Sequence, residues 1–153
     1  MLYKSELNPE VWALVRGRYP GEISFRCTSQ KVGLYNAAAG QYVEFDVSAN
    51  KLKVSKVSPL PSPKEMRVTG FAMTESGGVF ASFRSHEGET SRSGIFRLSF
   101  DASGLGSWVP LENATGPYLQ GNSVERLLGT DGTDLIYTRD LDGVAYWSKL
   151  ASK

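Results

Sequence analysis

Four aspartates lie close together near the C-terminal end of the sequence. They are Asp131, Asp134, Asp140 and Asp142, and Glu125 stands just before them. Carboxylates grouped in this way can hold a divalent cation or work as an acid–base pair. Asp131 and Asp134 are therefore candidate metal ligands. The alternative is that Asp131 and Asp142 belong to tight turns, where an aspartate side chain accepts hydrogen bonds from its own backbone.

Aromatic residues form a second candidate site in the same half of the chain. An exposed ring beside an acid is a common way to bind sugars and peptides, because the ring stacks while the acid accepts hydrogen bonds. The candidates for ligand binding are Trp108, Tyr137, Tyr146 and Trp147. Aromatic side chains also pack across neighbouring strands, and that structural role is the alternative for all of them.

Other chemistry is poorly represented. Cys27 is the single cysteine and His86 the single histidine, so neither an intrachain disulfide nor a four-ligand zinc site is expected. Cys27 lies in an alternating stretch and is expected to be a small buried residue. His86 lies in a polar stretch without periodicity and is expected in a loop. The sequence contains no Walker loop, nucleophile elbow or dinucleotide fingerprint, and we expect no cofactor.

The composition is that of an ordinary globular domain. The chain has 153 residues, of which 41% are hydrophobic, with 17 basic and 16 acidic side chains. This near balance of charge gives no reason to expect a nucleic acid or a membrane surface as partner. Residues 1–8 lack the basic start and apolar block of a signal peptide, so a cytoplasmic location is expected.

The elements that must position these residues are mostly strands. Asn8–Gly17 is expected to form one short helix, because Asn8 can cap its start and Gly17 can end it. From Ile23 onward the apolar residues alternate, which is typical of strands. The expected strands are Ile23–Thr28, Val32–Asn36, Gln41–Val47, Lys51–Val57, Val68–Thr74, Val79–Arg84, Gly94–Phe100, Trp108–Leu111, Val124–Gly129, Leu135–Arg139 and Val144–Leu150.

The strand pattern repeats itself along the chain. Gly70–Phe83 aligns with Arg126–Arg139 at an offset of 56, and Gly40–Val54 resembles Gly94–Val109 at an offset of about 55. Two separate pairs with nearly the same offset indicate a unit of about 55 residues. A four-stranded unit of this size suits a propeller blade with generous loops.

Two motifs in these units resemble a known class of proteins. Thr130–Tyr137 (TDGTDLIY) and Gly77–Ser82 (GGVFAS) resemble inner-strand segments of β-propeller repeat proteins of the broad NHL-like or YncE-like kind. The resemblance covers roughly residues 23–150 and includes no family fingerprint. It implies an all-β fold of antiparallel, propeller-like blades with a short N-terminal helix. A β-sandwich or barrel of about ten strands is the alternative.

The number of units limits how such a fold can close. We expect an N-terminal helical segment at 1–22 and one β domain at 23–153, with repeats near 23–68, 69–123 and 124–153. A propeller needs at least four blades, so two or three are expected to be completed by copies of the chain, by a partner that completes the β architecture, or by the rest of a longer chain. Residues 1–70 carry ten basic and six acidic side chains and residues 71–153 seven and ten, which suits head-to-tail association.

These observations favour a non-enzymatic binding or assembly module that presents its loops to a protein or a small molecule. The alternative function is a metal-assisted hydrolase or lactonase of the propeller type, with Asp131 and Asp134 as metal ligands. The two hypotheses differ in whether the protein holds a stoichiometric divalent ion.

Overall fold

The computed structural model describes residues 23–48, 51–85, 92–117, 123–131, 133–141 and 144–151. Within these ranges the chain forms eleven strands and no helix, so the expected all-β class is confirmed. The expected helix at Asn8–Gly17 lies outside the described residues. No helix in the described ranges has the length and apolar character needed to cross a membrane.

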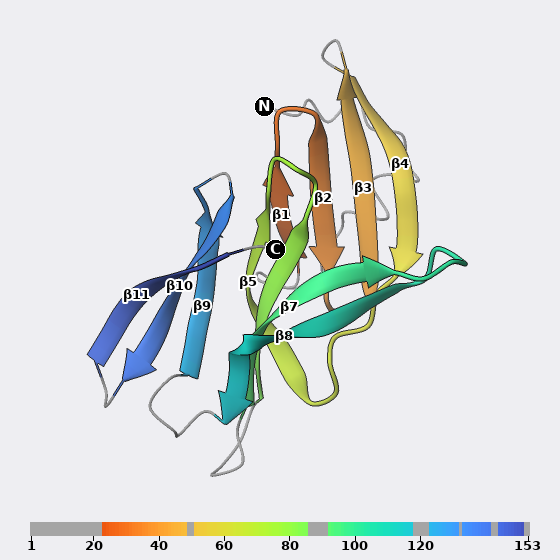
Figure 1. Ribbon diagram of the computed structural model, residues 1–153. Helices are drawn as coiled ribbons and strands as arrows, with labels where there is room; N and C mark the ends of the chain where they lie inside the picture. The colour runs from red at the N-terminus through yellow and green to blue at the C-terminus, as the bar shows by residue number, and fades with distance from the viewer. Residues whose placement is uncertain are drawn as a thin grey trace.

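The strands form three open antiparallel sheets, and each sheet is a consecutive up-and-down series (Figure 1). Sheet A contains β1 (Ile23–Cys27), β2 (Lys31–Asn36), β3 (Gln41–Ser48) and β4 (Lys51–Pro59). Sheet B contains β5 (Met66–Met73), β6 (Val79–Ser85), β7 (Arg92–Phe100) and β8 (Gly106–Pro117). Sheet C contains β9 (Ser123–Thr130), β10 (Asp134–Leu141) and β11 (Val144–Ala151).

All eleven expected strands are present, and their ends are confirmed to within a few residues except in β8. That strand was expected to end at Leu111 but continues to Pro117, because its second half pairs with the beginning of β7 from Arg92 to Gly94. The register shifts between Gly94 and Phe96, so the two halves of β8 follow different pairings. A sequence pattern read one strand at a time does not contain this pairing partner.

Short polar turns connect the strands within each sheet. In the β7–β8 turn, the Asp101 carboxylate accepts hydrogen bonds from the backbone N–H groups of Ser103 and Leu105. Gly104 in the same turn has a φ of 83°, a backbone conformation that residues other than glycine rarely adopt. These hydrogen bonds and this glycine explain why the sequence DASGLG turns sharply between two strands.

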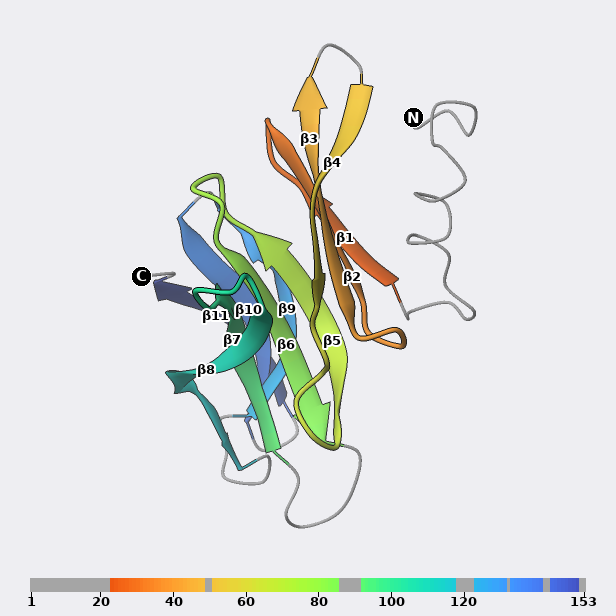
Figure 2. The same ribbon diagram turned by 90° about the vertical axis from the view of Figure 1, so that its right-hand side faces the viewer.

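The three sheets are stacked with sheet B in the middle (Figure 2). The interface of sheets A and B is a single apolar cluster that contains Tyr35, Tyr42, Leu60, Phe71, Met73, Val79, Ala81, Phe83, Phe96 and Leu98. The interface of sheets B and C is a second cluster that contains Ala72, Phe80, Ile95, Leu127, Leu135 and Tyr137. Sheet B therefore buries both of its faces, as a middle layer must.

Sheet A carries a further apolar cluster on its other face. Leu34 and Val43 are next to Tyr35 and Tyr42 in sequence, and neighbouring residues on a strand project to opposite faces. Leu34, Val43 and Phe45 are all buried, and partly buried side chains of the same sheet surround them. Both faces of this sheet are therefore apolar.

The first strands of the three sheets lie side by side, with β5 in contact with both β1 and β9 (Figure 2). Ser29, in the turn after β1, donates hydrogen bonds from its backbone N–H and its hydroxyl to the carboxylate of Glu75, in the turn after β5. Thr133, in the turn after β9, lines the same hollow as Glu75. The three strands therefore end at the same end of the molecule and run in the same direction.

Candidate functional site

Asp131 and Asp134 lie in and beside the turn between β9 and β10. One oxygen of the Asp131 carboxylate accepts the backbone N–H of Asp134 at 3.0 Å, and the other accepts the ammonium of Lys149 at 2.6 Å. The hydrogen bond from Lys149, helped by the one from the Asp134 backbone, lowers the pKa of Asp131 to about 2. Both carboxylate oxygens are thus used within the turn and its ion pair.

This arrangement favours the turn-forming role of Asp131 over the metal-ligand role. The described residues contain no group of three or more histidine, cysteine, aspartate or glutamate side chains that could hold a metal ion. Asp142 lies outside the described ranges. The cation site at Asp131 and Asp134 stays a prediction that has no third ligand in the described part of the chain.

Two of the aromatic candidates, Trp108 and Tyr137, lie in different apolar clusters. Trp108 packs edge-on against Tyr35 and Phe83, with ring centroids 5.2 and 5.3 Å away, in the cluster between sheets A and B. Tyr137 is buried in the other cluster, between sheets B and C. These two residues have the packing role that aromatics on strands commonly have.

Tyr146 and Trp147 occupy neighbouring positions of β11, opposite Arg139 and Thr138 of β10. Their side chains are outside what the structure describes, so their proposed role in ligand binding stays a prediction. His86 also lies outside the described residues.

The expectation that Cys27 is buried is wrong. Its thiol group is free and the residue is exposed. Strand β1 is at the edge of sheet A and pairs only with β2 among the described strands, and its last three residues are all exposed. Alternation in the sequence suggested a buried face, but the edge position of β1 leaves both faces open at this end.

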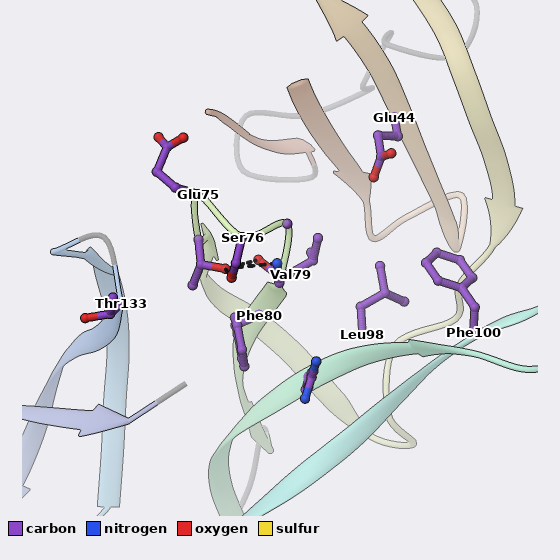
Figure 3. A pocket seen from close by; sticks show the side chains of 12 residues that line it. Glu44, Glu75, Ser76, Val79, Phe80, Leu98, Phe100 and Thr133 are labelled. Carbon is purple, nitrogen blue, oxygen red and sulfur yellow. Dashed lines mark hydrogen bonds between the residues drawn. The ribbon is translucent and has the colours of Figure 1, made fainter. Parts of the chain in front are cut away.

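A hollow lies where the turns after β5 and β9 approach β3 and β7 (Figure 3). We call it the turn hollow. Its volume is about 690 Å³. Its lining consists of Glu44 from β3, residues 74–80, Arg97, Leu98 and Phe100 from β7, and Thr133. Leu98, Phe80 and Phe100 give this hollow an apolar floor, and the turn residues give it a polar rim.

Two charged residues of the turn hollow are already engaged within the protein. The Glu44 carboxylate accepts the Lys31 ammonium at 2.7 Å and the Tyr42 hydroxyl at 2.9 Å. The hydrogen bond between Lys31 and Glu44 raises the pKa of Lys31. The pKa of Tyr42 is also raised, mainly because the residue is buried and secondarily because the Glu44 charge is nearby. Glu75 is held at the rim by Ser29.

Arg97 differs from the other charged residues of the turn hollow. Its side chain is exposed, and no carboxylate among the described residues pairs with it. A guanidinium group has five N–H donors in a fixed planar arrangement. Arg97 can therefore donate to a polar group that enters the turn hollow.

The hydroxyl groups in the turn hollow stabilise the β5–β6 turn. The hydroxyl of Thr74 hydrogen-bonds that of Ser76 at 2.9 Å and accepts the backbone N–H of Gly78 at 2.9 Å. A Cβ atom added to Gly78 would lie 2.8 Å from the ring of Phe80, so only glycine fits there. The lining residues offer donors, acceptors and an apolar surface, which suits binding.

Sequence reasoning did not identify this hollow. Glu44, Glu75, Arg97 and Thr133 belong to four separate strands or turns and have no common spacing in the chain. The single signal was the alignment of Gly70–Phe83 with Arg126–Arg139, which places Glu75 opposite Asp131 in the expected turns. That signal indicates where the turns are but does not indicate that they meet.

Comparisons of the chain with known protein families, with characterised proteins and with solved structures give no match. The resemblance to propeller repeat proteins therefore stays a prediction from the sequence motifs.

Proposed function

We propose that this protein is a cytoplasmic binding module built as part of a β-propeller, with its three sheets as successive blades. The observation that supports this proposal is the position of β1, β5 and β9. They are the first strands of their sheets, they lie side by side, and they run in the same direction. Later strands of each sheet follow outward in chain order, as they do in propeller blades.

The turn hollow is the proposed binding site of this module. A pocket that combines an apolar floor with a few polar groups is typical of ligand sites. We propose that it takes a small polar molecule or a short segment of a partner protein, with Arg97 donating to an acceptor group on that ligand. Glu44 keeps its bonds to Lys31 and Tyr42 and acts as a fixed part of the wall.

The test is binding measured by nuclear magnetic resonance with a panel of sugars, nucleotides and dipeptides. We expect at least one class to shift the backbone signals of residues 74–78 and 133. Arg97→Gln should abolish that shift, whereas Arg92→Gln should leave it unchanged, because Arg92 is exposed on the same strand but does not line the turn hollow.

Two results would contradict the proposal. The first is a panel in which no compound affects the turn residues. The second is metal-dependent hydrolysis of ester or lactone substrates that is lost in Asp131→Asn, which would support the hydrolase alternative instead.

A further inference from the structure

Two hollows lie away from the turn hollow, along the first strands of the three sheets. One has a volume of about 340 Å³ and is lined by residues of β1, β5 and β9, and the other has a volume of about 520 Å³ and is lined by residues of β5, β6, β9 and β10. Thr69 and Arg126 line both. The two hollows are therefore adjacent, and we call them together the arginine cleft.

The charged residues that line the arginine cleft are all basic. They are Arg26, Arg67, Arg84 and Arg126, and no aspartate or glutamate lines either hollow in the described part of the chain. Three of them come from the first strands: Arg26 from β1, Arg67 from β5 and Arg126 from β9. Because these strands lie side by side, sheet stacking brings together charges that are far apart in the sequence.

Three of these guanidinium groups, those of Arg26, Arg67 and Arg126, retain unused hydrogen-bond donors. Arg126 donates its Nε to the backbone oxygen of Thr69 at 2.8 Å, which ties the side chain to the neighbouring first strand. Arg26 donates from one terminal nitrogen to the backbone oxygen of Phe25 at 2.8 Å, and the Arg67 backbone pairs with Arg84 while its side chain makes no hydrogen bond within the described residues. The remaining donors of Arg26, Arg67 and Arg126 are free to bind a ligand.

Like charges that share a cleft repel one another, and an anion that enters the cleft relieves this repulsion. Guanidinium groups match carboxylate and phosphate geometry because two parallel N–H groups can meet two oxygens. Exposed neutral side chains stand beside these charges. Phe25 is 62% exposed and Leu128 is 47% exposed, and both line the smaller hollow.

We propose that the arginine cleft binds a small anionic ligand. Its phosphate or carboxylate is held by Arg126, which lines both hollows, and by Arg67 of the larger hollow, and its apolar part lies against Phe25 and Leu128 of the smaller hollow, beside Arg26. This site shares no lining residue with the turn hollow, so it is independent of the function proposed for that hollow.

The test is calorimetric titration of the full chain at low salt with phenyl phosphate and with benzoate. These two probes carry the same ring, so comparing them shows whether the cleft prefers a phosphate or a carboxylate. We expect one of these probes to bind more tightly than inorganic phosphate or acetate, which lack the ring. Arg67→Gln should weaken that binding about tenfold or more, since a charged hydrogen bond contributes about 1.5–3 kcal/mol. Arg92→Gln is the control and should have no effect, because Arg92 is exposed and lines none of the three hollows.

Further variants separate the two parts of the cleft. Phe25→Ser should weaken binding of the ring-bearing probe while leaving that of inorganic phosphate or acetate unchanged. Arg126→Lys keeps the charge but loses the planar donor pair, and it should also weaken binding. Circular dichroism spectra that match the wild type show that each variant is folded.

Three results would overturn the proposal. They are a lack of binding of all four probes at millimolar concentration, unchanged affinity in Arg67→Gln, and binding of a single-stranded oligonucleotide or heparin when the small probes do not bind. The last would identify the cleft as a surface for an anionic polymer.

Discussion

The carboxylate of Asp131 accepts hydrogen bonds from the Lys149 ammonium and from the backbone N–H of Asp134, and these bonds lower its pKa to about 2. Because the folded pKa lies below the usual value of 3.8, the ionised form stabilises the folded state. The contribution is complete above about pH 5, and it is lost as the pH falls toward 2 and the carboxylate is protonated.

We predict that Asp131→Asn removes part of the acid sensitivity of this protein. The urea concentration at which half of the wild-type protein is unfolded should decrease as the pH is lowered from 5 to 2. The decrease should be smaller in the variant, because asparagine cannot form the ion pair at any pH. Lys149→Gln should behave in the same way, since it removes the other partner. If both variants follow the wild-type curve, the ion pair makes no contribution in solution.

Trp108 and Tyr137 illustrate how little a residue type says about its role. Both were candidates for ligand binding, and both pack into clusters between sheets. A strand residue faces whichever layer covers its side of the sheet, and that layer comes from a distant part of the chain. Residue type and spacing therefore indicate that such an aromatic is available but do not indicate what covers it.

At the scale of elements, the contact between β5 and β9 depends on a glycine. A Cβ atom on Gly70 would overlap the backbone oxygen of Leu127 and would lie 2.9 Å from its nitrogen. The same Leu127 nitrogen donates a hydrogen bond to the Ser82 hydroxyl at 2.8 Å, which ties β9 to β6. Sheet C is thus held against sheet B by backbone packing as well as by side chains.

We predict that Gly70→Ala lowers the free energy of unfolding by about 1–3 kcal/mol, the usual cost of inserting a group into a well-packed contact. Gly129→Ala is the matched control. It lies on β9, has nothing within 4 Å of an added Cβ, and should not destabilise the protein. Urea denaturation of both variants measures the difference, and equal stability would mean that β5 and β9 are not in close contact.

At the scale of the whole molecule, the stack of sheets is open. Sheet B buries both faces, whereas sheets A and C are the outer layers and each has one face directed away from sheet B. On sheet C, Leu135 and Tyr137 face sheet B, so Ile136 between them projects outward. The three sheets that we propose as blades are too few to close a propeller, and our proposal is that copies of the chain or a partner complete the architecture.

We predict that sedimentation at micromolar concentration gives a mass of at least two chains of 16.7 kDa. Ile136→Glu should shift the mass toward one chain while the circular dichroism spectrum stays unchanged, because a charge on the outer face of sheet C opposes apolar association. A wild-type chain that is monomeric and unfolds cooperatively would show that the three sheets are stable alone, and the ring proposal would then be wrong.

Local signals in the sequence determined the strands and turns of this protein. Alternation of apolar residues predicted all eleven strands, and turn residues such as Asp101 and Gly104 marked where hairpins bend, because both signals act within a few residues of one another. The same signals did not predict the pairing of the end of β8 with the start of β7, since that pairing joins residues more than twenty positions apart.

The tertiary structure alone decided the candidate sites. Arg126 lines one hollow with Arg26 and an adjacent hollow with Arg67 because three first strands lie side by side, and Glu44 and Arg97 line one hollow because sheet A stacks on sheet B. It also decided that Cys27 is exposed and that Trp108 and Tyr137 are packed between sheets. Burial and proximity depend on which layers stack, and no local pattern in a single sequence contains that information.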